Sequence, residues 1–503
     1  MSALTPSASC VRPPALLELS AVQLAHLIKR KDISPVELVE QSIERCQEIQ
    51  ALCNPIAVEL YRCARSAARR AEADVLRGHP LGRLHGVPFS IKEGLGLAGW
   101  PQTCGSTLRR QVTASSTATV AQRLISAGGI PVALGNQAEM ALWPETDNLL
   151  YGRTLNPYRA SRTAGGSSGG DAVMVASACV PFALGTDGAG SVRIPAAFNG
   201  VFGLKPSRGL VPLSGHLPLD ERGREQANAQ AVSAHFAAGP LCRHAEDLSE
   251  VLQIIAGPDG IDRNIHSRFA PVAEPARLRR VHLYLPERMK WSSPVSEAVS
   301  QALNDAGQCL ASQGATLHAW QEPGMHNAFF IWLAVLKLEA QVRLADYLGD
   351  GQPLSYWRAA RASLAGRARH ATGPLLATWL DSVGDALGNP GLGRFLAQRD
   401  HLQRAFAELF DGHSVLLMPV TPGVAPEHGH ALKRPLDVAY CALFNALGLP
   451  ALSVPMGRLD QGCPVAVQLV AGPGQDALLL DAAVFLQTQF GGWLKPALSH
   501  FKG

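Results

Sequence analysis

The sequence carries no strong excess of charge of either sign. Its formal net charge is only +4 over 503 residues, and its 45 lysines and arginines do not gather into one long basic run. Proteins that bind nucleic acid usually present a concentrated basic surface to the phosphates. The charge pattern therefore does not indicate nucleic acid as a partner.

Cysteine and histidine patterns typical of disulfide frameworks or metal sites are also missing. The ten cysteines are spread singly, with no CxxC pair. HExxH is absent, and His428-Gly429-His430 is too short a pattern to identify a metal site. We therefore expect free thiols, as in a reducing compartment, and neither a metal nor an organic cofactor.

No apolar run is long enough to cross a bilayer. The most apolar stretch, residues 329–338, is much shorter than a membrane span and contains Lys337. The first twenty residues lack the basic segment followed by an apolar segment that marks a secretory signal. These absences predict a soluble, cytoplasmic protein without an integral membrane segment.

The sequence does contain a large apolar fraction, 47%, arranged in alternating patterns. Residues 20–76 show helical periodicity, with Ser34 as an N-cap and Pro35 at the first helical position. Residues 86–93 and 129–135 are typical of short buried strands. Helices that alternate with short apolar strands predict an α/β architecture around a covered sheet.

The second half of the sequence has three kinds of segment. Residues 220–235 are polar and indicate a surface loop, whereas residues 323–410 have the pattern of several helices rich in Trp, Phe and Leu. Strand-like runs then return at residues 415–420, 451–455 and 465–470. Because no internal repeat or low-complexity linker interrupts the chain, we expect residues 1–503 to form a single domain.

Two clusters of glycine and serine are the most informative feature. The first is TAGGSSGG at residues 163–170, and the second is GTDGAGSVRIPA at residues 185–196. Glycine is unfavourable in regular structure because it loses much backbone freedom and packs no side chain. Two such clusters need a reason, and one reason is that their backbone N–H groups approach a ligand closely.

Three other interpretations fit the clusters less well. A flexible linker is disfavoured because the apolar run 172–184 joins the clusters. A phosphate-binding loop would need GxxxxGK[ST], which is absent. Residues 165–169 match the G-x-S-x-G of a nucleophile elbow, but that motif follows a strand, and residues 156–162 are polar and contain Pro157.

The two clusters resemble the amidase signature, GGSSGG followed by GTDxxGS[IV]RIPA. Residues 86–93 resemble the GVPxxxKD segment of the same family, and residues 444–450 and 462–470 are similar to its C-terminal strands. The resemblance implies the amidase-signature fold, an α/β fold in which a large mixed, twisted sheet is covered by helices on both faces.

The resemblance also implies a division of labour along the chain. Residues 20–210 correspond to a signature core with the catalytic triad, and residues 323–410 to a helical substrate-pocket region. Residues 415–490 correspond to C-terminal strands and a helix that complete the sheet.

The family uses a Ser-Ser-Lys triad to hydrolyse amides. At the matching positions Lys92 is the base, Ser167 the relay and Ser191 the nucleophile. The resemblance also implies a cis Gly166–Ser167 peptide and an oxyanion hole made by the N–H groups of Gly188, Ala189, Gly190 and Ser191. Side chains expected to orient this loop are those of Ser168, Thr186, Asp187 and Arg193.

Two positions depart from the family pattern. Glu93 stands where aspartate is usual, and Ala189 replaces a glycine in the nucleophile loop. Neither change removes a member of the triad.

A lysine can act as the base only when its amine is neutral. An ordinary lysine, with a pKa of about 10.4, is almost wholly charged at neutral pH. Burial would lower this pKa, and a fall of roughly three units corresponds to about 4 kcal/mol. The residues around Lys92 are largely apolar, so we expect it to be buried and to draw a proton from Ser191 through Ser167.

Residues 139–158 and 198–207 resemble the fatty-acid amide hydrolase 2 branch of the family, which cleaves amides with long apolar acyl chains. We therefore expect an apolar acyl or aryl amide as the small-molecule substrate, and a homodimer is compatible with the sequence. Candidate substrate contacts are Met140, Trp143, Phe329, Phe330 and Trp332, although ordinary core packing is the favoured interpretation for any single aromatic residue after 323.

Two alternatives to an independent amidase remain open. The chain could be the A-type subunit of a tRNA-dependent amidotransferase that works with a partner, which the weak basicity and the aromatic-rich segment after residue 323 disfavour. It could also be a catalytically idle amidase-like binding protein, which the intact triad disfavours. Cys104 lies in no recognisable nucleophile motif, and we expect it to be a buried packing residue.

Overall fold

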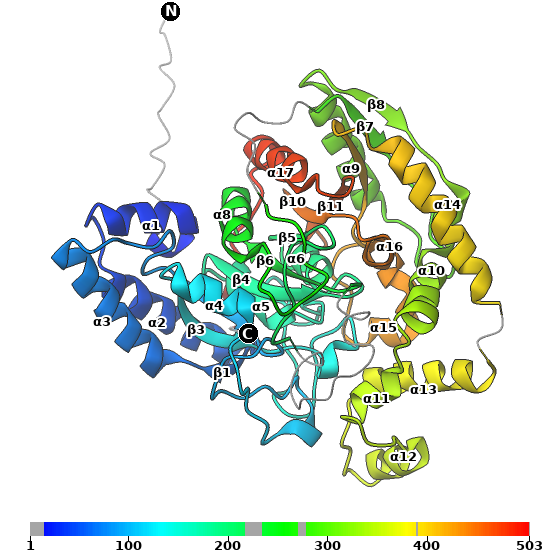
Figure 1. Cartoon of the computed structure of the whole chain (residues 1–503), viewed down its shortest axis with the longest axis horizontal. Helices are drawn as coiled ribbons and strands as arrows, with labels where there is room; N and C mark the ends of the chain where they lie inside the picture. The colour runs from blue at the N-terminus through cyan, green and yellow to red at the C-terminus, as the bar shows by residue number, and fades with distance from the viewer. Residues whose placement is uncertain (1–14, 217–233, 270–277, 389–390, 502–503) are drawn as a thin grey trace, which may run out of the picture.

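A single mixed sheet organises the structure. The computed structural model describes residues 15–216, 234–269, 278–388 and 391–501. Within these residues eleven strands form one sheet in the order β1-β3-β2-β4-β6-β5-β10-β11-β9-β7-β8. The sheet extends across the molecule from β1 at the lower left to β7 and β8 at the upper right, with helices along it (Figure 1). This is the mixed α/β sheet that the sequence predicts.

The elements as far as the second glycine–serine cluster alternate between helix and strand. They are α1 (Ala21–Lys29), α2 (Pro35–Cys53), β1 (Ile56–Glu59), α3 (Tyr61–Arg77), β2 (Pro88–Lys92), α4 (Thr119–Ser126), β3 (Ile130–Gly135), α5 (Gly169–Ala176), β4 (Phe182–Asp187) and α6 (Arg193–Phe198).

The later elements contain a long helical stretch between two groups of strands. They are β5 (Phe202–Lys205), β6 (Ala237–Cys242), α8 (Ala245–Ile255), β7 (Arg280–Leu283), α9 (Glu297–Ala311), β8 (Thr316–Ala319), α10 (Ala328–Ala334), α11 (Leu344–Leu348), α12 (Tyr356–Leu364), α13 (Thr372–Ala386), α14 (Gly393–Leu409), β9 (Ser414–Pro419), α15 (His430–Lys433), α16 (Ala439–Leu447), β10 (Ala451–Asp460), β11 (Cys463–Val470) and α17 (Asp476–Phe490).

Helix α2 forms for the reasons that its sequence suggests. The Ser34 side chain accepts hydrogen bonds from the N–H groups of Val36 and Glu37, and Pro35 occupies the first turn. The helical segment predicted over residues 20–76 is in fact three helices with β1 between α2 and α3. Periodicity misses β1 because it has only four residues and is defined by its antiparallel pairing with β3.

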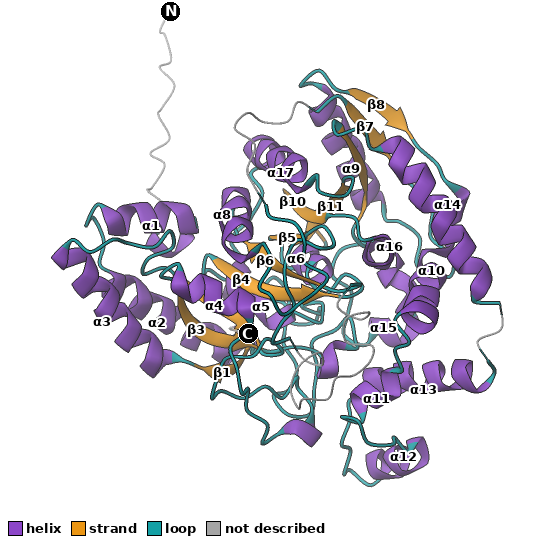
Figure 2. Ribbon diagram, in the orientation of Figure 1, coloured by secondary structure: helices purple, strands orange, loops and turns teal. Residues whose placement is uncertain are grey.

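Both faces of the sheet are packed. In β4, Phe182 and Leu184 belong to one hydrophobic cluster, whereas Ala183 between them belongs to another. Successive side chains of a strand point to opposite faces, so the alternation shows a core on each side. Helices α8, α9 and α17 contribute to the first core, and α2 and α5 to the second (Figure 2).

The three strand-like runs near the C-terminus are confirmed as β9, β10 and β11, which are neighbours in the sheet. The loop predicted at residues 220–235 lies almost wholly outside the described residues. The nine described cysteines are all free thiols, as expected. In the part of the chain that the structure describes, no helix combines the length and the apolarity needed to span a membrane.

Candidate active site

The glycine–serine clusters and Lys92 meet at one edge of the sheet. Strands β2 and β4 are parallel neighbours, with Ile91 opposite Leu184. Their carboxyl ends therefore lie side by side, and β2 ends on Lys92 while β4 leads into the second cluster. The edge beyond the carboxyl ends of parallel strands is where α/β proteins commonly bind their ligands.

Lys92 is fully buried and contacts neutral hydroxyl groups. Its Nζ donates to Ser167 Oγ at 2.6 Å and to Thr186 Oγ1 at 2.9 Å. Burial lowers the pKa of Lys92 to about 8, although the negative charge of Asp171 acts in the opposite direction. The expected burial of this amine is thus confirmed, and a substantial fraction of it would be neutral at slightly alkaline pH.

Ser167 is held in place by a close approach of two backbone segments. The Gly166–Ser167 peptide is cis, as the family resemblance implies. A Cβ atom added at Gly166 would lie only 2.8 Å from the backbone N of Glu145 and from the carbonyl O of Trp143. Glycine at position 166 is therefore a packing requirement, because any side chain would displace residues 143–145.

A buried ion pair shapes the second cluster. Asp187 and Arg193 are both fully buried, and Arg193 Nε lies 3.0 Å from Asp187 Oδ2. Arg193 also donates to Gln468 at 2.8 Å and to Asn445 at 2.7 Å. Burial alone would raise the pKa of Asp187, but the charge and hydrogen bonds of Arg193 outweigh this and hold that pKa well below its usual range.

The same carboxylate changes the expected oxyanion hole. The N–H of Gly190 donates to Asp187 Oδ1 at 2.7 Å, so this N–H is directed toward the carboxylate and is not available to an oxyanion. Our expectation for Gly190 is therefore corrected. The N–H groups of Gly188, Ala189 and Ser191 donate no hydrogen bond within the described residues and remain the candidate donors.

Ser191 joins the two clusters through its backbone. Its carbonyl oxygen accepts a hydrogen bond from the N–H of Ser168 at 3.2 Å, and its side chain is half-buried. Within the described residues no hydrogen bond links the hydroxyl groups of Ser167 and Ser191. The structure thus brings Lys92 and Ser167 into direct contact. Ser191 is connected to this pair through its backbone, by the hydrogen bond from the N–H of Ser168, the residue after Ser167.

The comparisons with known proteins identify the family of the chain. The sequence profile of the Amidase family matches residues 37–480 of the chain. The chain belongs to the amidase signature family. It is 34% identical to fatty-acid amide hydrolase 2-B of Danio rerio, an alignment that covers 96% of this chain and 91% of that protein.

Two further relatives of this amidase show the breadth of the family. The chain is 30% identical to the A-type subunit of the glutamyl-tRNA(Gln) amidotransferase of Symbiobacterium thermophilum, over 92% of its own length and 95% of that protein. A solved amidase structure superimposes with a TM-score of 0.75 at 26% identity, covering 94% of this chain and 100% of the other. These matches show the amidase-signature fold.

The other predicted site residues of the amidase contact different parts of the chain. Met140 packs with Cys104 and Leu348 in a small apolar cluster, and Trp143 lies against Gly373 of α13. A hydrogen bond of 2.8 Å joins Trp332 Nε1 to the carbonyl oxygen of Gly188.

The remaining two aromatic candidates pack against other aromatic rings. The ring centroid of Phe330 lies 5.3 Å from that of Phe395 in a stacked arrangement, and that of Phe329 lies 5.6 Å from Trp332. Phe330 therefore contributes to the core between α10 and α14, as the simpler interpretation of this segment predicts.

Sequence reasoning missed two buried polar residues beside Lys92. Asp171 accepts a hydrogen bond from Ser90 at 2.9 Å, and burial raises its pKa to about 7. His216 Nε2 lies 3.1 Å from Thr186 Oγ1, and burial lowers the pKa of His216 to about 3, so it is neutral. A single acidic residue in the apolar helix that follows GGSSGG was a usable signal for Asp171, but no motif marks His216.

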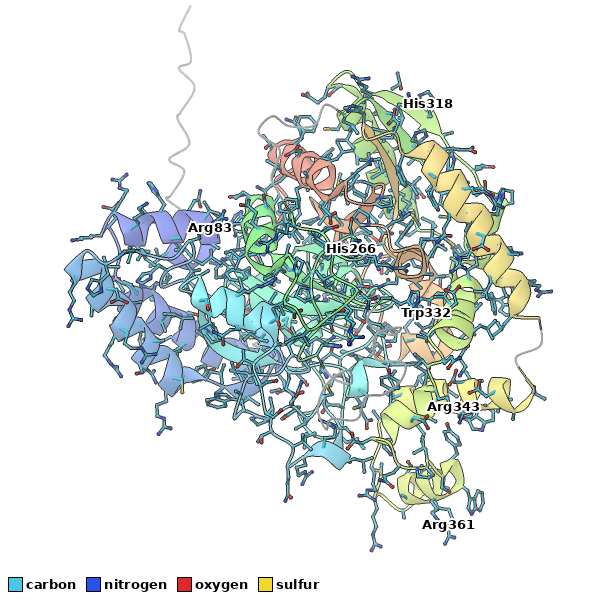
Figure 3. All side chains as sticks on the ribbon, viewed as in Figure 1. Arg83, His266, His318, Trp332, Arg343 and Arg361 are labelled. Carbon is cyan, nitrogen blue, oxygen red and sulfur yellow. The ribbon has the colours of Figure 1, made fainter. Side chains whose placement is uncertain are left out.

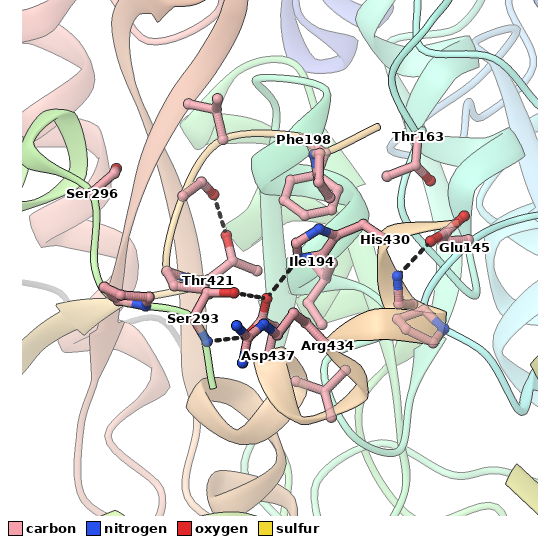
Figure 4. Close-up of a pocket in the computed structure, with 18 residues that line it drawn as sticks. Glu145, Thr163, Ile194, Phe198, Ser293, Ser296, Thr421, His430, Arg434 and Asp437 are labelled. Atoms are coloured by element: carbon pink, nitrogen blue, oxygen red, sulfur yellow. Dashed lines mark hydrogen bonds and ion pairs between the residues drawn. The ribbon is translucent and has the colours of Figure 1, made fainter. Parts of the chain in front are cut away.

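A cavity of about 160 Å³ adjoins helix α6 (Figure 4). Polar side chains in its lining already form hydrogen bonds within the protein. Asp437 accepts one from the N–H of Ser293 at 2.7 Å, and Glu145 accepts one from the N–H of Ala431 at 2.9 Å. The apolar part of its lining comes from Ile194, Phe198, Val424 and Val438, together with four prolines. A ligand in this cavity would mainly meet apolar surface.

The lowered pKa of Lys92 predicts a pH dependence. Because the neutral amine is the candidate base, kcat/KM should rise as pH increases through about 8 and then level off. In Lys92→Ala this inflection should disappear, leaving a residual rate that increases with hydroxide concentration. Initial rates measured from pH 6 to 10 would check this, and an unchanged inflection in Lys92→Ala would exclude Lys92 as its source.

The buried ion pair predicts a large effect on stability. Arg193→Met would leave Asp187 charged and buried without its partner, and breaking such a pair typically costs about 3–5 kcal/mol. Urea unfolding should show a loss of this order. Arg83→Met, which removes a solvent-exposed partner of Glu250, is the matched control and should cost no more than about 1 kcal/mol. Equal losses in both variants would contradict the central role of the buried pair.

Proposed function

We propose that this amidase hydrolyses amides with an apolar acyl or aryl group, using Ser191 as nucleophile, Ser167 as relay and Lys92 as base. The observation that carries the proposal is the fully buried Lys92 amine, 2.6 Å from Ser167 Oγ and with its pKa lowered to about 8. A buried amine that donates to serine and threonine hydroxyls, without a carboxylate ligand, can lose its proton and accept another.

The proposed reaction has two halves. Neutral Lys92 accepts the Ser167 proton while Ser167 accepts that of Ser191, and Ser191 Oγ bonds to the amide carbon. The N–H groups of Gly188, Ala189 and Ser191 are the donors that stabilise the oxyanion that results. As the C–N bond breaks, the proton returns through Ser167 to the departing amine. Water then attacks the acyl ester by the same relay and releases the carboxylic acid.

Apolar residues near the loop support the proposed substrate class. Leu336, Ala340 and Val342 form a buried cluster against which Phe236 and Trp332 pack, and Trp332 reaches the nucleophile loop. The cleavage of fatty-acid amides named for the Danio rerio relative is consistent with such surroundings.

We also propose that the cavity beside α6 receives one substituent of the amide. Helix α6 begins two residues after Ser191, and the Ile194 side chain in the cavity wall also lies against Gly190. An amide has a substituent on each side of the reacting carbonyl, so a site for it needs two spaces. The largely apolar lining of this cavity suits an alkyl or aryl substituent.

The alternative roles predict different behaviour of the purified chain. An amidotransferase subunit would need its partner for activity. The 30% identity to such a subunit is the observation that favours this alternative. An idle binding protein would not react with a fluorophosphonate at Ser191. Turnover by the isolated chain, together with covalent labelling of Ser191, would exclude both.

The nucleophile assignment is tested by Ser191→Ala. We expect kcat to fall by on the order of 10⁴ or more and fluorophosphonate labelling to be lost, because no other hydroxyl replaces the attacking atom. The assay uses p-nitroanilides of straight-chain acids, from acetyl to palmitoyl, and the longer chains should give the higher kcat/KM. Ser363→Ala, on the exposed helix α12, is the control. Normal turnover by Ser191→Ala would refute the assignment.

The substituent cavity is tested by Val438→Trp. The larger side chain should fill part of the space, so KM for amides with bulky substituents should rise by roughly tenfold, equivalent to about 1.4 kcal/mol. The smallest amide should be hydrolysed at a nearly unchanged kcat. Val383→Trp, on the exposed face of α13, is the matched control. If both variants retain wild-type KM values for every amide, the cavity does not receive the substrate.

A further inference from the structure

Helix α10 reaches into the nucleophile loop through one side chain. The Trp332 indole N–H donates to the carbonyl oxygen of Gly188 at 2.8 Å, across a separation of 144 residues in the sequence. Trp332 lies on the side of α10 that faces the centre of the molecule (Figure 3). The helical region after residue 323 is therefore tied directly to the loop that carries Ser191.

Gly188 is also confined by a second aromatic ring. A Cβ atom added at this position would lie 2.3 Å from the Phe236 ring, so a side chain there would force this ring to move. Phe236 and Trp332 both pack against the same small cluster formed by Leu336, Ala340 and Val342. The Gly188 backbone thus contacts one ring by packing and the other by a hydrogen bond.

The hydrogen bond to Gly188 O fixes the direction of the Ala189 N–H as well as that of the carbonyl. The Gly188–Ala189 peptide is trans and planar, so its C=O and N–H point in opposite directions. When the indole holds the carbonyl oxygen on one side, the Ala189 N–H must face the other side. Rotation of this peptide would turn the N–H away and would also break the hydrogen bond to Trp332.

Asp187 anchors the loop from within. Its carboxylate accepts the N–H groups of Gly190 and Val192, at 2.7 and 3.2 Å. In the segment 185–191 only Ala189 and Ser191 are half-buried, and the other residues are buried. The loop is therefore held from within by the Asp187 carboxylate and from outside by the Trp332 indole. Ala189 and Ser191 are its partly exposed residues.

We propose that Trp332 is a positioning residue that orients the Ala189 N–H toward the oxyanion of the reaction. This inference rests on the proposed amide hydrolysis. It differs from a role for Trp332 in substrate contact, because an oxyanion donor acts in the transition state. Loss of the indole N–H should therefore lower kcat and leave KM nearly unchanged, whereas loss of a substrate contact should raise KM.

The test compares Trp332→Phe with Trp379→Phe, which alters an exposed tryptophan on α13. In Trp332→Phe we expect kcat for p-nitroanilides to fall by roughly tenfold or more, with KM within about twofold, since a removed oxyanion donor costs on the order of a hundredfold. Binding of an alkyl trifluoromethyl ketone, which forms a tetrahedral oxyanion adduct, should weaken in parallel. The pH inflection assigned to Lys92 should stay in place.

Rates are normalised to the fraction of sites that a fluorophosphonate labels, so that partial misfolding does not imitate a catalytic loss. Trp332→Leu, which has no side-chain hydrogen-bond donor, is the second variant if the phenylalanine variant does not fold. An unchanged kcat, or a raised KM with unaffected trifluoromethyl ketone binding, would overturn the proposal. If the wild-type protein neither hydrolyses amides nor reacts at Ser191, the proposed function itself fails instead.

Discussion

The buried amine of Lys92 is the constraint on which the rest of the site depends. An amine removed from water is costly in its charged form unless a counter-ion accompanies it. Here its close partners are the hydroxyls of Ser167 and Thr186, while the carboxylate of Asp187 is occupied by Arg193. Burial outweighs the negative charge of Asp171, which raises the pKa of Lys92, so this pKa falls to about 8. Strand β2 can deliver a lysine to this position because it runs parallel to β4, which supplies Thr186 and then the nucleophile loop.

The nucleophile loop, in contrast, contains buried groups that stay charged because they are paired. Asp187 and Arg193 keep their ionic forms in the interior because each is surrounded by hydrogen-bonding partners, which include Gln468 on β11 and Asn445 on α16. These partners come from the C-terminal strands and helices, so the shape of the loop depends on contacts with distant parts of the chain. An amine whose pKa is lowered by burial and a buried ion pair thus lie at the same sheet edge, each stabilised by a different means.

Patterns over a few residues of the sequence predict the elements that are determined by interactions between neighbouring residues. The Ser34–Pro35 start of α2 and the alternating strands near the C-terminus follow from capping and side-chain periodicity, and the structure confirms them. The cis Gly166–Ser167 peptide was recognisable only through the family motif. The Gly190 donor was predicted wrongly because its N–H is claimed by a carboxylate three residues earlier, a choice that depends on the folded loop. His216 approaches Thr186 from a segment that carries no motif.

The helical region after residue 323 is bonded directly to the signature core. It is joined to the signature core by the His370–Glu139 pair at 2.9 Å, by the Arg109–Asp350 pair at 2.7 Å and by the Trp332 bond to Gly188. Helix α10 holds a backbone carbonyl of the nucleophile loop through Trp332, and we propose that it also faces the substrate. Any acyl group that shifts α10 also shifts the peptide between Gly188 and Ala189. Differences among acyl groups should therefore appear in the rate of the chemical step as well as in binding, which a rigid pocket separate from the loop would not produce.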